Sequence, residues 1–290
     1  MKPAAFEYVA PASLDEALGL LARHGAEAKV IAGGQSFVPM ANFRLLRPEV
    51  VVDLNRIPSL AYVRETPEGL AVGAMTRHRE FERSALVRRV CPLLSEAVPN
   101  IAHAVIRNRG TMGGSLSHAD PAAEWPVVAV ALGATMVLRS AKGERRVAAK
   151  DFFVALMTTA LRPEEILVEI RFPRVPPKSG AAFLEVSRRH GDFALVAVAA
   201  QLTLDPAGKV AQARLALGGV SATPVDANVE ASSLAGRAPD AAAFAALGER
   251  IAAQLQPNED LHASAQYRRE VAAVLVRRAL DEAAEKAKAA

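Results

Sequence analysis

The first 55 residues alternate between strand and helix patterns, and this rhythm constrains the fold more than any other feature of the sequence. Short apolar runs typical of buried strands lie at Phe6–Val9, Lys29–Ala32 and Val50–Asp53. A capping-box pattern that begins at Ser13 predicts a helix ending near Gly25, and residues 37–46 predict a second, shorter helix. Strands and helices that alternate in this way favour a small parallel sheet.

After residue 55 the pattern changes to hairpins and isolated strands mixed with helices. Residues 60–73 predict a hairpin whose turn contains Pro67, and the apolar segment 122–132 predicts a buried helix. Residues 107–120 form a long polar segment that contains several glycines. Three further strands are predicted at Thr135–Ser140, Arg145–Ala149 and Ile166–Phe172.

The last part of the chain predicts a sheet followed by helices. A proline-bearing stretch at residues 174–180 has the composition of a linker. Three strands are predicted beyond it, at Ala181–Arg188, Ala194–Leu204 and Val210–Gly218, and three helices at about Pro224–Ala235, Asp240–Gln254 and His262–Lys286. We therefore expect an α+β chain in three pieces, residues 1–55, 56–177 and 178–290.

Composition excludes several classes of protein. Hydrophobic residues make up 51% of the 290 residues and charged residues 23%, which is typical of a globular chain. The sequence has no apolar run of membrane-spanning length and no secretory signal, so we expect a cytoplasmic protein without a transmembrane segment. The single cysteine, Cys91, excludes a cysteine-ligated zinc site and an iron–sulfur cluster held by this chain alone. Scattered acids and few aromatic residues argue against nucleic-acid binding.

Two glycine doublets stand out as sites for chemistry. Ala32-Gly-Gly-Gln-Ser36 directly follows a predicted strand, and Thr111-Met-Gly-Gly-Ser115 lies inside the polar segment 107–120. Paired glycines let main-chain N–H groups approach an anion, and a neighbouring hydroxyl adds a donor. Two such segments on different lobes could hold a diphosphate from both sides; the alternative is that each doublet is only a tight turn. Neither segment is a Rossmann fingerprint or a P-loop.

These segments carry a resemblance to a known family. KVIAGGQSFVPMANFRLLRP and NRGTMGGSLSHADPAAEWP resemble the FAD-binding motifs of the medium, flavoprotein subunit of the molybdenum hydroxylases, the carbon monoxide dehydrogenase and xanthine dehydrogenase family. LEVSRRHGDFALVAVA is similar to the family's C-terminal segment. The resemblance implies a two-lobed FAD-binding fold, with a small parallel α/β lobe and a mixed or antiparallel α+β lobe. A C-terminal three-stranded sheet with a helical bundle would follow.

The resemblance also implies which residues bind FAD. The diphosphate would be bound by Ala32, Gly33, Gly34, Gln35 and Ser36, with Val30, Ile31 and Phe37 as backbone neighbours. The second segment would complete this grip with Thr111, Gly113, Gly114 and Ser115. No catalytic residue and no metal ligand is implied.

Four further positions are implied around the flavin. Glu124 stands where the family has an acid that hydrogen-bonds FAD, and Ile101 and Leu167 stand where apolar residues border the cofactor. Phe193 matches an aromatic beside the isoalloxazine ring; the alternative is a core aromatic, although the preceding Gly191-Asp192 argues against a position inside a strand. Glu185 departs from the family, since several relatives carry lysine there, and this weighs against an electrostatic contact to the flavin.

The function implied by the resemblance is electron transfer within a larger complex. The chain would take electrons from iron–sulfur clusters on a small partner subunit and pass them through FAD to an external acceptor. A large molybdenum-cofactor subunit would oxidise the organic substrate, and the complex would form a dimer of heterotrimers. The alternatives are a self-sufficient flavin oxidoreductase and a non-catalytic nucleotide-binding scaffold. The sequence leaves the organic substrate and the acceptor open.

Overall fold

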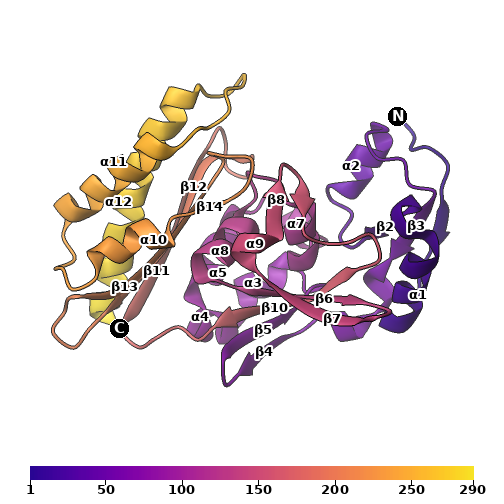
Figure 1. Cartoon of the computed structure of the whole chain (residues 1–290), viewed down its shortest axis with the longest axis horizontal. Coiled ribbons are helices and arrows are strands. Elements are labelled where there is room, and N and C mark those ends of the chain that lie inside the picture. The colour runs from indigo at the N-terminus through magenta and orange to yellow at the C-terminus, as the bar shows by residue number, and fades with distance from the viewer.

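The computed structural model describes residues 1–290, which form three blocks in a row (Figure 1). The first block, here the N-terminal lobe, has a parallel sheet in the order β1-β3-β2, as the sequence predicts. Its strands are β1 (Glu7–Val9), β2 (Ala28–Ile31) and β3 (Val50–Asp53), and its helices are α1 (Leu14–His24) and α2 (Phe37–Asn42). Ser13 caps α1 by accepting a hydrogen bond from the Glu16 N–H.

The second block, here the middle lobe, contains an antiparallel sheet in the order β4-β5-β10-β6-β7. These strands are β4 (Val63–Thr66), β5 (Gly69–Gly73), β6 (Thr135–Ser140), β7 (Gly143–Ala148) and β10 (Ile166–Pro173). A small hairpin is formed by β8 (Phe153–Ala155) and β9 (Thr158–Thr159). The helices are α3 (His78–Arg83), α4 (Ala85–Val90), α5 (Pro92–Ala97), α6 (Ala104–Arg107), α7 (Met112–His118), α8 (Glu124–Leu132) and α9 (Ala149–Phe152).

The third block, here the C-terminal domain, is a sheet covered by helices. Its strands are β11 (Ser179–Ser187), β12 (Ala194–Leu204), β13 (Val210–Gly218) and β14 (Val225–Asp226), paired in that order. Its helices are α10 (Asn228–Ala231), α11 (Ala241–Gln254) and α12 (Ala265–Ala289), and α11 and α12 cover the outer face of the sheet (Figure 1). The three predicted strands are confirmed, but the sheet has a fourth.

The expected helix Pro224–Ala235 is wrong at its start. Residues 225–226 pair instead with β13, and only residues 228–231 are α-helical. A two-residue strand carries too little periodicity to be detected in a sequence, and its pairing depends on β13 lying beside it. The expectation of a three-stranded sheet is corrected for the same reason.

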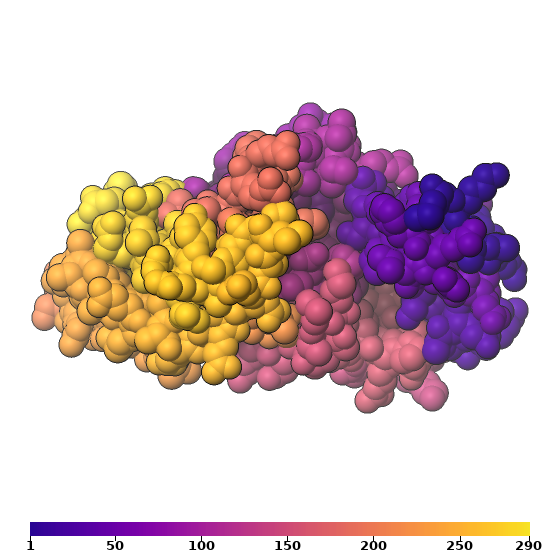
Figure 2. Space-filling model, turned by 90° about the horizontal axis from the view of Figure 1, so that it is seen from above, coloured from indigo at the N-terminus to yellow at the C-terminus, as the bar shows by residue number.

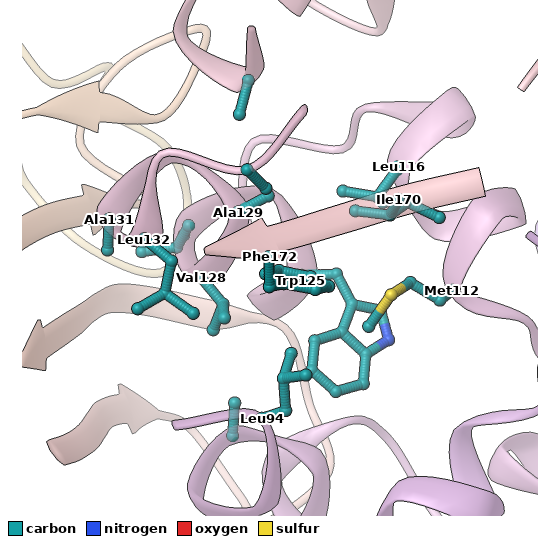
Figure 3. Packing of buried hydrophobic residues seen from close by; sticks show 14 of the residues in the cluster. Leu94, Met112, Leu116, Trp125, Val128, Ala129, Ala131, Leu132, Ile170 and Phe172 are labelled. Atoms are coloured by element: carbon teal, nitrogen blue, oxygen red, sulfur yellow. The ribbon is translucent and has the colours of Figure 1, made fainter. Parts of the chain in front are cut away.

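Helix α8 lies between the middle lobe and the C-terminal sheet. Every one of its residues is buried, which explains why its sequence is apolar all round rather than on one face. Trp125 of α8, Met112 of α7 and Phe172 of β10 belong to the largest hydrophobic cluster (Figure 3). On the opposite side, a Cβ atom on Gly218 of β13 would lie 2.4 Å from Val127 Cγ2, so helix and sheet are in close contact.

Helix α7 lies inside the glycine-bearing segment 107–120, where the sequence indicated no regular element. Gly113 and Gly114 are part of this helix, although glycine disfavours helix by about 1 kcal/mol relative to alanine. Met112 and Leu116 are fully buried one turn apart, so tertiary packing outweighs the local preference.

The N-terminal lobe does not complete its core alone. Leu18, Leu21 and Val52 share one hydrophobic cluster with Val137 and Ile166 of the middle lobe. Figure 2 shows the N-terminal lobe in indigo at one end and the C-terminal domain in yellow at the other, with the middle lobe between them. The divisions at residues 55 and 177 stay predictions. None of the helices combines the length and the apolar character that a membrane crossing requires.

Candidate functional site

A cleft of about 930 Å³ is lined by residues of all three blocks. Its volume lies within the range typical of small-molecule and cofactor sites, ~300–1,000 Å³. The predicted contact residues that line it are Val30, Ala32, Gly33, Gly34, Gln35, Ser36, Phe37, Ile101, Thr111, Gly113, Gly114, Ser115, Glu124, Leu167 and Phe193. The structure therefore gathers all of them except Ile31 around one space. Ile31 lies behind the cleft wall, where its Cδ1 atom is 3.4 Å from the Cβ position of Gly34.

A row of main-chain donors follows β2. The N–H groups of residues 33–36 donate no hydrogen bond to any main-chain carbonyl of the protein. The carbonyl oxygen of Ala32 accepts from Asn55 Nδ2 at 2.8 Å, and that of Gly33 accepts from Gln35 Nε2 at 2.9 Å. Because C=O and N–H point in opposite directions across a peptide bond, these bonds turn the next N–H groups away from Asn55 and Gln35. Unpaired N–H groups in sequence form a concave site for an anion.

In the second glycine doublet, Gly113-Gly114, the main-chain N–H groups are hydrogen-bonded within the protein, which differs from the prediction. The N–H of Gly113 donates to Ala74 O at 2.8 Å, that of Gly114 to Thr111 Oγ1 at 3.1 Å, and that of Ser115 to Thr111 O at 3.1 Å. The expectation that the amides of the glycine doublet Gly113-Gly114 hold an anion is therefore wrong, because both are already hydrogen-bonded within the protein. The N–H of Thr111 and the hydroxyls of Thr111 and Ser115 are the donors that this segment has left.

Gly113 and Gly114 are needed because the fold leaves no room for a side chain at either position. A Cβ atom on Gly113 would lie 2.4 Å from Ala74 Cβ, and one on Gly114 would lie 2.7 Å from Thr111 Oγ1. Both distances are shorter than side-chain atoms tolerate, so any larger residue would push α7 away from β5 or break its N-cap.

The two doublets lie side by side in space. The Cβ position of Gly114 is 3.6 Å from Ala32 Cβ, and the Cβ position of Gly33 is 2.4 Å from the carbonyl oxygen of Arg109. The guanidinium of Arg77 donates to that same carbonyl oxygen and to Asn55 Oδ1. One arginine therefore ties the loop after β3 to the segment that precedes α7.

His78 contacts the segment that precedes α7, and the sequence did not predict this contact. Trp125 Nε1–H donates to His78 Nδ1 at 2.9 Å, so the ring proton of a neutral His78 resides on Nε2. Burial lowers the pKa of His78 to about 3, with the charges of Arg107 and Arg77 adding to the effect, so the ring is neutral at physiological pH. Nε2 lies 2.6 Å from the Cβ position of Gly110. The glycine next to Thr111 was the one signal that pointed to this contact.

Glu124 is a buried acid that lines the cleft. It is the first residue of α8 and only 7% exposed. Burial raises the pKa of its carboxyl to about 7, opposed by a hydrogen bond from its own N–H. Near neutral pH this carboxyl therefore exists in both protonation states.

The mouth of the cleft has an exposed aromatic and apolar walls. Phe193 is 67% exposed, so the alternative of a core aromatic is wrong. Ile101 and Leu167 are buried apolar residues of the lining. Arg188 Nη1 lies 3.2 Å from His262 Nδ1 on the side of the C-terminal domain. An apolar ring system with an anionic tail matches this combination of walls and N–H donors.

Comparisons with known proteins match nearly the whole chain. Residues 4–175 match the family model described as FAD binding domain in molybdopterin dehydrogenase, and residues 181–283 match the CO dehydrogenase flavoprotein C-terminal domain. The 6-hydroxypseudooxynicotine dehydrogenase complex subunit alpha of Paenarthrobacter nicotinovorans is 43% identical over 99% of this chain and 97% of its own length. The caffeine dehydrogenase subunit beta of a Pseudomonas species is 40% identical over 99% of this chain and 97% of its own length.

Solved structures give the same result. A chain of carbon monoxide dehydrogenase from Hydrogenophaga pseudoflava superimposes with a TM-score of 0.95 at 37% identity, covering 99% of both chains. A chain of quinoline 2-oxidoreductase from Pseudomonas putida 86 superimposes with a TM-score of 0.93 at 38% identity, again covering 99% of both chains.

Proposed function

The chain belongs to the FAD-binding medium subunits of the molybdenum hydroxylase family, and from this premise we propose how its residues serve electron transfer. It is an oxidoreductase subunit, and FAD is its cofactor. In the proposed arrangement, the cleft between the three blocks holds FAD. Electrons enter from iron–sulfur clusters on a small partner subunit and leave to an external acceptor.

The observation that carries this proposal is the row of unpaired N–H groups at residues 33–36. A diphosphate needs several donors that converge without side chains in between, and both Gly33 and Gly34 provide this. Gly34 has a φ of 75°, a left-handed conformation that side chains disfavour. The hydroxyls of Thr111 and Ser115 approach the same space from the middle lobe.

The remaining contact residues orient the ring system. Ile101 and Leu167 exclude water from one part of the cleft, while Phe193 offers an aromatic face at its mouth. Glu124 presents a carboxyl that accepts a hydrogen bond when ionised and donates one when protonated. Bound FAD supplies the redox chemistry, since it accepts electrons and passes them on singly or in pairs.

The partners follow from what this chain lacks. Its one cysteine is fully buried at Cys91, so the thiolates that ligate iron–sulfur clusters belong to another chain. We propose a small iron–sulfur subunit and a large molybdenum-cofactor subunit as partners, assembled as a dimer of heterotrimers. The names of the relatives include substrates as different as caffeine and carbon monoxide, which fits a division in which another chain selects the substrate.

Rapid-mixing absorbance tests this function. The FAD-loaded chain alone is mixed with candidate organic substrates, and then with a reduced iron–sulfur partner subunit. We expect the flavin absorbance to bleach only with the reduced partner. Bleaching by an organic substrate in the absence of any partner would contradict the proposal and favour a self-sufficient oxidoreductase.

A further inference from the structure

Arg77 is a cation without a carboxylate partner, close to the unpaired N–H groups of residues 33–36. Its guanidinium donates to two uncharged oxygens, Asn55 Oδ1 and the carbonyl oxygen of Arg109, and takes part in no salt bridge. Burial and the charge of Arg109 lower the pKa of Arg77, and the charge of Asp53 opposes them. The guanidinium remains charged at physiological pH, so an anion close to it would relieve an unfavourable charge balance.

The main chain fixes Arg77 beside the second glycine segment. Two main-chain hydrogen bonds of 3.0 Å, one on either side of Arg77, pair residues 76–78 with residues 110–112. Arg77 therefore lies directly opposite Thr111 in an antiparallel bridge. Thr111 lines the cleft, whereas Arg77 does not. The cation is thus held behind the cleft wall.

A chain of hydrogen bonds leads from the guanidinium to the first of the unpaired amides. Arg77 Nη2–H donates to Asn55 Oδ1, and Asn55 Nδ2–H donates to Ala32 O at 2.8 Å. That carbonyl belongs to the same peptide group as the N–H of Gly33, which has no main-chain acceptor. Each donor in such a chain polarises the next, so the cation makes the Gly33 N–H a stronger donor.

Asn55 has only one orientation that satisfies its neighbours. Besides its bond to Ala32 O, its Nδ2 donates to Asp53 Oδ1 at 2.6 Å, and its own main-chain N–H donates to the same oxygen at 2.8 Å. Both Nδ2 hydrogens therefore have acceptors, and Oδ1 is left to accept from Arg77. A flipped amide would lose all three side-chain bonds.

We propose that Arg77 is the positioning residue that balances the charge of the bound diphosphate, acting through Asn55 and the Ala32–Gly33 peptide without touching the cofactor. The inference rests on the proposed function, because it takes the amides of residues 33–36 as the diphosphate site. Its contribution is electrostatic and orientational. A flavin without the diphosphate gains nothing from it.

Equilibrium titrations of the cofactor-free chain with FAD and with riboflavin separate this role from a general structural one. Arg77→Gln removes the charge and should weaken FAD binding about tenfold, but riboflavin binding less than about twofold. Arg77→Lys keeps the charge without the planar fork, so it should bind FAD more tightly than Arg77→Gln does. Arg214→Gln is the matched control and should change neither affinity. Arg214 is also partly buried and donates to a carbonyl oxygen, that of Leu132, but it lies outside the cleft lining.

Nuclear magnetic resonance of the cofactor-free chain reads the hydrogen-bond chain without FAD. Labelling with carbonyl-¹³C alanine and ¹⁵N glycine selects the amides of Ala-Gly pairs, which in this sequence end at Gly33, Gly208 and Gly236. Arg77→Gln should shift the Gly33 amide proton upfield, because its donor strength falls. The Gly208 and Gly236 amides donate to carbonyl oxygens elsewhere in the chain and should not move. Inorganic diphosphate should shift the Gly33 signal downfield, at about tenfold higher concentration in Arg77→Gln than in the wild type.

Three results would each overturn the proposal. They are equal losses of FAD and riboflavin affinity in Arg77→Gln, an Arg77→Lys variant that binds FAD as weakly as Arg77→Gln, and a Gly33 resonance unaffected by Arg77→Gln. Thermal unfolding verifies the fold of each variant. Should Arg77→Gln not fold, Asn55→Ala interrupts the same chain at an exposed position, with the same expected shift at Gly33 and the same selective loss of FAD. Failure of the wild type to bind FAD counts against the proposed function, whereas the Gly33 resonance and inorganic diphosphate still decide the role of Arg77.

Discussion

Gly33 and Arg109 lie in different lobes, yet a Cβ atom on Gly33 would be only 2.4 Å from the carbonyl oxygen of Arg109. Gly110 Cα lies almost as close, at 2.7 Å, so Gly33 faces main chain rather than flexible side-chain ends. The contact brings the donor row after β2 against the segment that begins α7. Because this contact is so short, the shape of the cleft depends on the absence of a Cβ methyl group at Gly33.

The first prediction concerns this contact. Gly33→Ala should lower FAD affinity at least about tenfold and destabilise the chain by about 1–3 kcal/mol, because the lobes must separate. Fluorescence titration with FAD and urea unfolding measure the two effects. Gly19→Ala is the control: nothing lies within 4 Å of its Cβ position, and the change should stabilise α1 by about 0.5–1 kcal/mol without affecting FAD. Equal loss of affinity in both variants would contradict the assignment.

A second prediction separates the cleft aromatic from other exposed aromatics. Phe193 is 67% exposed and Phe43 is 64% exposed, but only Phe193 lines the cleft. Phe193→Ala should weaken FAD binding by about 0.5–1.5 kcal/mol, the usual contribution of an aromatic contact, and leave unfolding unchanged. Phe43→Ala should alter neither quantity. Calorimetric titration with FAD decides, and unchanged affinity in Phe193→Ala would remove this residue from the site.

Acid should destabilise the chain through His78. Burial holds its pKa at about 3, below the ordinary value of 6.5, so the unfolded chain binds this proton first as pH falls. The stability contributed by neutral His78 is therefore complete above pH 6.5 and declines from there toward pH 3, by a total on the order of 5 kcal/mol. Urea unfolding at several pH values measures the decline. His78→Gln, which keeps an acceptor for Trp125, should be less stable near pH 7 and decline less steeply; an equal slope would refute the role of His78.

Glu124 should have the opposite pH dependence. Its pKa is raised to about 7, so the folded chain holds this proton more tightly than the unfolded chain does. The resulting stability is complete below the ordinary glutamate pKa and is lost as pH rises through 7. Glu124→Gln should therefore stabilise the cofactor-free chain at pH 8, by a few kcal/mol at most, and give no gain at pH 5. Calorimetric unfolding at the two pH values should reveal the difference, and a gain of equal size at both would contradict it.

Cys91 should report on opening of the middle lobe. Its side chain is fully buried, and burial raises the pKa of the thiol to about 12. A thiol reagent should therefore modify it only when the lobe unfolds, and bound FAD should slow the modification further. The rate at which Cys91 reacts with the reagent, followed by absorbance with and without FAD, measures how often the lobe opens. Modification of the native chain within seconds would show that the cluster around α8 opens more readily than its packing indicates.

The sequence predicted those elements whose pattern is local. Strands β3, β12 and β13 were placed at their observed bounds, because continuous apolar runs ended by turn residues are strong local signals. Helix α7 was missed, since its glycines oppose helix and its stability comes from burial of Met112 and Leu116 in distant structure. The strand β14 was missed because only pairing with β13 defines it.

The sequence predicted which residues line the candidate site more completely than it predicted which of their groups are free to bind a ligand. Motif resemblance found the residues that line the cleft, but not that the amides of Gly113 and Gly114 are already used within the protein. Whether an N–H group is free depends on where Ala74 and Thr111 lie in the fold.

Parallel equilibrium titrations of the cofactor-free chain with FAD and with riboflavin test the central claim most directly, because riboflavin has the ring system without the diphosphate. If the amides of residues 33–36 hold the diphosphate, FAD should bind at one equivalent and riboflavin at least about a hundredfold more weakly, a difference of about 2.7 kcal/mol. Binding of riboflavin as tight as that of FAD would contradict the account.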